Sequence, residues 1–125
     1  MKEIDYSSKS TSELIKIFEQ ACLEQYDTYI TDDLETYDRN YDIQKLVTKE
    51  LAFRGQSDRR SLLALLSHEN PEVRLRAAKR VYPVARDQAR KCLEALAAAN
   101  LPGTQSLDAG MTLSRLGEVP DCLDH

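Results

Sequence analysis

The stretch that most constrains this fold is Asn-Pro-Glu-Val-Arg-Leu-Arg-Ala-Ala, at residues 70–78. Asn70 is a good N-cap, and Pro71 suits the first helical position, where no backbone N–H is required. Glu72 adds negative charge to the first turn, which the helix dipole favours. Apolar residues then recur at three- and four-residue spacing. We therefore predict a helix from residue 71, whose alanine pair at 77–78 lets a neighbouring helix approach closely.

The same periodicity predicts five further helices, so the fold class is all-α with about six helices. A capping box is predicted at Ser10 and Glu13, and a second one at Asp32 and Glu35. The short turn between the first two helices implies a long antiparallel hairpin, and Gly55 suits the left-handed residue after it. The additional helices are expected at residues 11–30, 33–54, 58–68, 86–99 and 104–116.

The apolar stripes of the first two helices are expected to pack inside this hairpin. Ile30 extends the stripe of the first helix, and Leu34, Tyr37 and Tyr41 continue it on the second. These four residues are therefore predicted to lie on packing faces.

An internal repeat follows the hairpin. The leucine-rich segment 62–66 aligns with 92–96, thirty residues on, and the small pair at 77–78 aligns with Ala109-Gly110. Each unit is a leucine-rich helix, a turn, and a helix with a small pair in its middle, as in stacked helical repeats. This predicts two HEAT-like helix pairs after the hairpin, forming a short α-solenoid.

These segments carry a resemblance. Leu-Ala-Phe-Arg-Gly at 51–55, the run at 62–78 and Leu-Asp-Ala-Gly-Met-Thr-Leu at 107–113 resemble a bacterial domain-of-unknown-function family of small ARM/HEAT-like helical proteins. The resemblance covers roughly residues 12–117. It implies the fold, and it implies no established activity and no catalytic residues.

The length of 125 residues suits one domain, 1–125, with an ordered core at about 10–117 and loose residues at 1–9 and 118–125. The N-terminus lacks the apolar run of a signal peptide, and no segment has the roughly 18 apolar residues of a membrane span. The three cysteines are widely spaced and form no paired framework, which indicates a reducing compartment. We therefore expect a cytoplasmic protein without membrane contact.

Charge is distributed unevenly along the chain. Residues 1–50 carry 12 acidic and 6 basic side chains, whereas residues 54–91 carry 4 acidic and 10 basic ones. These are either solvated helix faces or two complementary surfaces for partners.

The acidic half contains the first candidate site, a partner-binding strip with tyrosines. Carboxylates at 35, 38 and 42 share one helix face, an arrangement that suits a basic protein surface, weak binding of a divalent cation, general acid–base work or simple solvation. The sequence contains no zinc-ligand cluster, nucleotide-binding loop or nucleophile motif. We therefore expect no enzyme, cofactor or metal. The strip comprises Asp32, Asp33, Glu35, Tyr37, Asp38, Tyr41 and Asp42.

The alternative site is an arginine-rich surface for a nucleic-acid backbone. Acidic residues outnumber basic ones overall, and no stacking aromatics interleave with the arginines, so nucleic acid is the less favoured partner. The best prediction is a non-catalytic protein-binding module, specifically an immunity protein that neutralises a toxin. Self-association of the two charge poles is the remaining alternative. The basic set comprises Arg59, Arg60, Arg74, Arg76 and Arg80.

Overall fold

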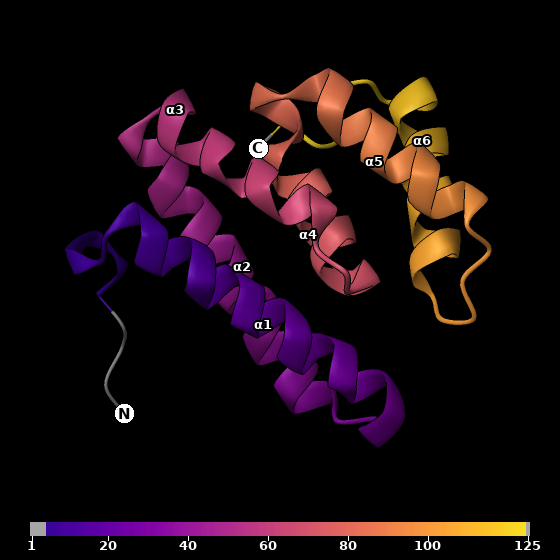
Figure 1. Cartoon of the computed structure of the whole chain (residues 1–125), viewed down its shortest axis with the longest axis horizontal. Coiled ribbons are helices and arrows are strands. Elements are labelled where there is room, and N and C mark those ends of the chain that lie inside the picture. The colour runs from indigo at the N-terminus through magenta and orange to yellow at the C-terminus, as the bar shows by residue number, and fades with distance from the viewer. Residues whose placement is uncertain (1–4, 125) are drawn as a thin grey trace. The chain divides into compact units, whose positions relative to one another are not determined.

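The computed structural model describes residues 5–124, and within this range every regular element is helical (Figure 1). The all-α prediction is confirmed. The chain divides into two compact units, residues 1–61 and residues 62–125, and each is described by itself. The organisation as a single domain stays a prediction.

The first unit is built on a long helical hairpin. It contains a 3-10 turn η1 (Tyr6–Ser8), then α1 (Thr11–Thr31), α2 (Leu34–Arg54) and the short α3 (Gln56–Arg59). The predicted capping box is present, because the Ser10 hydroxyl accepts from the backbone of Glu13 and the Glu13 carboxylate accepts from the backbone of Ser10. α1 and α2 run antiparallel along most of their length (Figure 1). Their core consists of Leu14, Phe18, Cys22, Val47 and Leu51.

The turn of the hairpin uses its two aspartates differently from the prediction. Asp32 adopts a left-handed conformation (φ 59°) as the C-cap of α1, and Asp33 is the N-cap of α2. The predicted capping box of Asp32 with Glu35 is therefore wrong. A two-residue turn has to reverse the chain at once, and aspartate tolerates the left-handed region better than most residues.

The buried stripe becomes polar towards the turn. It continues through Gln25 and Thr28 on α1 and through Gln44 and Asn40 on α2, all buried. The side-chain amide of Gln44 donates to the side-chain carbonyl oxygen of Gln25 at 2.9 Å. Because polar residues occupy the packing positions here, the apolar side chains near the turn fall off the buried stripe.

The second unit contains the remaining helices. It begins within the 3-10 helix η2 (Arg60–Ser67) and continues with α4 (Pro71–Val81), η3 (Tyr82–Val84), α5 (Arg86–Ala98) and α6 (Gln105–Glu118). The Asn70 side chain caps α4 by accepting from the backbone N–H of Glu72 at 2.8 Å, as predicted. α5 packs against both α4 and α6 (Figure 1).

The expected helix at 58–68 differs in type from the one observed. After α3, the chain winds as a 3-10 helix up to Ser67. In this tighter winding residues three apart lie above one another, and Leu62 and Leu65 are indeed both buried.

Parts of both termini that the sequence predicts to be loose have regular structure within the described residues. Residues 6–8 form η1, and α6 extends through Glu118. The guanidinium of Arg86 pairs with the carboxylate of Asp124 at 2.9 Å. Residues 1–4 and 125 lie outside the described residues. Between 5 and 124, no helix is both long and apolar enough to cross a membrane.

Candidate functional site: the acidic tip of the helical hairpin

The predicted acidic strip lies on the surface at the turn between α1 and α2. Asp32, Asp33, Glu35, Asp38 and Asp42 are all exposed. None of the five makes an ion pair with any part of the chain that the structure describes. Residues 27–42, which we call the hairpin tip, carry six acidic side chains and one basic one. The negative charge of the tip is therefore not compensated from within.

Asp33 has a local structural task. Its carboxylate accepts from the Thr36 hydroxyl at 2.6 Å and from the Thr36 backbone N–H at 3.1 Å. These hydrogen bonds, together with the charge of Arg39, hold the pKa of Asp33 below its usual range. Asp33 thus fixes the start of α2 and presents the other carboxylates.

Tyrosine rings connect the two helices at the tip. The ring of Tyr29 meets Tyr26 edge to face at 6.3 Å between centroids, and it meets Tyr37 of α2 in the same way at 6.2 Å. Such pairs prefer edge-to-face geometry. Tyr37 is accordingly half-buried in packing, whereas Tyr41 remains 40% exposed.

Two apolar residues at the tip were predicted to pack and do not. Ile30 is 86% exposed and Leu34 is 71% exposed. They flank the Asp32–Asp33 turn, where the buried positions belong to the polar residues described above. The signal that could have identified them is their place in the last turn of one helix and the first turn of the next. An exposed apolar pair within an acidic surface is typical of a protein-binding site.

The alternative arginine surface is not formed as predicted. Arg76 is only 7% exposed, and its Nε donates to the buried carboxylate of Glu72 at 2.9 Å. The other oxygen of Glu72 accepts from Gln105 at 3.1 Å. Arg59 is also 7% exposed. The prediction that Arg59 and Arg76 line a nucleic-acid surface is therefore wrong, because burial removes both from contact with a phosphate backbone. Of the other three, Arg60 is exposed, whereas Arg74 and Arg80 are half-buried.

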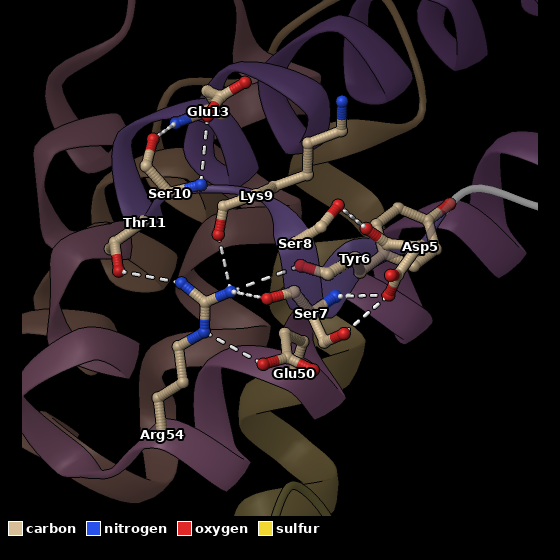
Figure 2. Close-up of polar contacts among 10 residues, drawn as sticks. All are labelled: Asp5, Tyr6, Ser7, Ser8, Lys9, Ser10, Thr11, Glu13, Glu50 and Arg54. Atoms are coloured by element: carbon tan, nitrogen blue, oxygen red, sulfur yellow. Dashed lines mark hydrogen bonds and ion pairs between the residues drawn. The ribbon is translucent and has the colours of Figure 1, made fainter.

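Arg54 is a further cation that internal contacts engage. Its Nη2 donates to the backbone carbonyls of Tyr6, Ser7 and Lys9, its Nη1 donates to the Thr11 hydroxyl, and its Nε pairs with Glu50 (Figure 2). The guanidinium thereby ties η1 and the start of α1 to the end of α2.

Two more cations of the basic segment are paired. The ammonium of Lys79 on α4 contacts the carboxylate of Asp108 on α6 at 2.6 Å. The guanidinium of Arg86 lies 5.0 Å from the ring centre of Tyr82 in addition to its pair with Asp124. Ion pairs with Glu50, Asp108 and Asp124 thus offset part of the positive excess along residues 54–91, whereas no ion pair among the described residues offsets the negative excess of the hairpin tip.

The carboxylates of the tip spread along the helix instead of converging. From residue 5 to residue 124, no three or more His, Cys, Asp or Glu side chains are arranged to hold a metal ion. A charged surface with apolar contacts is therefore the arrangement that the geometry supports at the tip.

Comparisons with known proteins place the chain in a family. A family model described as "Domain of unknown function (DUF2019)" matches residues 12–117. The crystal structure of the protein RPA1889 from Rhodopseudomonas palustris superposes with a TM-score of 0.88 at 31% sequence identity, covering 94% of this chain and 96% of that one. No curated protein matches.

Proposed function

Since the chain belongs to DUF2019, a family of unknown function, we propose from its own surface that it is a non-catalytic protein-binding module that binds through the hairpin tip. The observation that carries this proposal is the coincidence of exposed Ile30 and Leu34 with unpaired carboxylates around the same turn. Apolar anchors supply affinity when they are desolvated. The surrounding charge steers the partner and selects partners of the opposite charge. The expected partner is a protein with a basic rim around an apolar pocket.

More specifically, we propose an immunity protein that neutralises a cognate toxin by covering its active site. A covering protein needs a rigid element and a surface charge that attracts the toxin. The hairpin offers both, because tyrosine rings and the Asp33 cap hold the turn in place and the acids around it are unpaired. A HEAT-like arrangement of the helices and a cytoplasmic location, in keeping with the free cysteines, belong to the same proposal.

The test starts from the gene next to that of this protein, with the expectation that it encodes a toxin domain. Binding of the purified toxin domain is measured by calorimetry against the wild-type chain and against the triple variant Glu35→Lys, Asp38→Lys, Asp42→Lys. We expect the triple variant to lose binding by about 100-fold or more, because charge reversal turns steering into repulsion. Cell survival on co-expression of the toxin reports neutralisation.

A matched control separates the tip from net charge. Reversing Glu94, Glu118 and Asp121 changes the charge of the chain by the same amount at three exposed positions of the second unit. This control should bind like the wild type. Equal binding by the wild-type chain and the tip variant would refute the assignment of the surface.

Binding through arginines is the remaining alternative function. Because Arg59 and Arg76 are buried and Lys79 and Arg86 are paired with carboxylates, we expect the wild-type chain to give no gel shift with single- or double-stranded DNA or with RNA at low salt.

A further inference from the structure

A second surface, within the unit of residues 62–125, is built differently from the hairpin tip. An open hollow of about 520 Å³ lies between the end of α5, the connecting loop and α6. Its floor includes Ala97 of α5 and the small residues Ser106, Gly110 and Ser114, which form one stripe along α6. Beside this stripe stand Leu107 and Met111, which are 68% and 60% exposed. The face of α6 therefore carries an apolar ridge next to a hollow.

Gly110 is not explained by packing within the chain. The sequence predicts that Ala109-Gly110 is a packing pair like Ala77-Ala78. Ala109 is buried as predicted, but Gly110 lines the open hollow. A Cβ added at Gly110 would meet just one atom within 4 Å among residues 5–124, the Cβ of Ala97 at 4.0 Å, which is ordinary contact. Glycine in a helix interior lowers helix stability relative to alanine. Gly110 lies in the middle of α6, and packing among the described residues does not require its small size, so it leaves room for an outside body to approach the helix closely.

The charge of the lining indicates what that body is. None of the residues that line the hollow is charged, although 30% of the chain is. When two copies of one surface meet about a twofold axis, equivalent surfaces face each other and like charges are opposed. A lining without charge avoids this repulsion within the hollow. A basic or acidic partner would find no counter-charge in this lining.

The shape fits the same partner. Ridges of one helix pack into the grooves of another. The ridge of Leu107 and Met111 on one copy can enter the hollow above Gly110 on the other, and the reverse contact forms at the same time. We propose that α6 is a self-association face through which two copies of this chain form a symmetric dimer, with Gly110 at the crossing point. A single-helix contact of this kind is small, so we expect the dimer to be weak and reversible.

The experiment is sedimentation equilibrium of the full chain from about 5 µM to about 1 mM. The wild-type chain is expected to shift from the mass of one copy towards that of two. Gly110→Leu fills the hollow and favours the helix, and it should raise the dissociation constant at least about 30-fold without unfolding the protein. Met111→Glu introduces a negative charge from each copy into the proposed contact, and it should likewise raise the dissociation constant.

Two control variants make the outcome specific. Gly117→Leu changes the same residue type in the same helix, at a position outside the hollow where a Cβ meets nothing within 4 Å. Phe53→Glu introduces the same charge in the first unit, in place of an apolar side chain that is 86% exposed. Both controls should dimerise like the wild type, and circular dichroism should show all four variants folded.

Three results would overturn the proposal. A wild-type chain that remains monomeric at the highest concentration leaves the hollow to a different protein. A Gly110→Leu variant that dimerises as the wild type does places the contact elsewhere. Loss of the dimer in Phe53→Glu alone assigns it to the other unit.

Discussion

Among single residues, Arg54 shows how a non-local contact escapes prediction. Its guanidinium reaches carbonyl oxygens that lie 45 to 48 positions earlier in the chain. No spacing pattern marks a backbone carbonyl as an acceptor, so the sequence suggests a surface cation and loose residues before α1. The three-dimensional arrangement alone reveals that this one side chain orders the described part of that segment.

Removing this guanidinium should loosen the start of the chain. We expect Arg54→Ala to lower the free energy of unfolding by about 1–3 kcal/mol in urea, because three backbone carbonyls, two of them in part-buried hydrogen bonds, and Glu50 lose a charged donor. Arg54→Lys should recover only part of the lost free energy of unfolding, since an ammonium lacks the planar fork of a guanidinium. Arg39→Ala, which removes an exposed arginine with one long contact of 3.4 Å to Thr36, should change stability by less than about 0.5 kcal/mol. Faster cleavage by trypsin after Lys9 in Arg54→Ala provides an independent check.

The buried glutamine pair leads to a prediction in which two substitutions together cost less stability than one. Gln25 and Gln44 are fully buried and share one hydrogen bond, while the Nε2 atom of Gln25 and the Oε1 atom of Gln44 have no hydrogen-bond partner among the described residues. Replacing one partner by leucine leaves the other amide buried without its bond and should cost about 1–3 kcal/mol. Replacing both should cost less than either single change, because neither amide of the pair is then left buried without its hydrogen bond. Thermal unfolding of the four chains gives the coupling, and simple additivity would contradict the prediction.

At the scale of elements, prediction succeeds where the signal is local. The caps of α1 and α4 depend on residues two or three apart, Ser10 with Glu13 and Asn70 with Glu72, and both are present. The hairpin turn is also local, yet it offers two adjacent aspartates that can each act as a cap. The choice between them depends on which residue reverses the chain. Burial near the turn was mispredicted for Ile30 and Leu34, because periodicity does not reveal that Gln25 and Asn40 occupy packing positions there.

The cap of α2 gives this element a pH dependence. Since hydrogen bonds lower the pKa of Asp33 in the folded state, its carboxylate stabilises the fold at pH values above its pKa in the unfolded chain. That contribution is lost as the pH falls through the folded pKa. We therefore expect the wild-type chain to be more stable than Asp33→Asn at pH 7, with the difference shrinking from about pH 5 downwards.

Urea unfolding across this pH range measures the difference. Asp38→Asn removes the same charge from α2 without touching the cap, and it reports the general effect of charge at the tip. A difference between the wild type and Asp33→Asn that stays constant down to acid pH would argue against the cap as its cause.

At the scale of the whole molecule, the charge polarity of the sequence changes its meaning. The sequence suggests two poles, one acidic and one basic, that could meet between copies. In the fold, the pairs Arg76–Glu72, Lys79–Asp108 and Arg86–Asp124 neutralise part of the basic segment. The acids of the tip remain, and the uncharged hollow at α6 becomes the surface suited to a second copy.

Salt distinguishes these two modes of self-association. Each copy carries a formal charge of −4, so two copies that meet through an uncharged face repel each other at long range. Raising the salt from about 20 mM to about 300 mM screens this repulsion, and the dissociation constant of an α6 dimer should stay constant or fall slightly. Contact between an acidic and a basic pole would weaken over the same range, because screening removes its attraction. Sedimentation equilibrium at the two salt concentrations measures the sign of the change. A dissociation constant that rises several-fold with salt would favour contact between the acidic and basic poles over contact through α6.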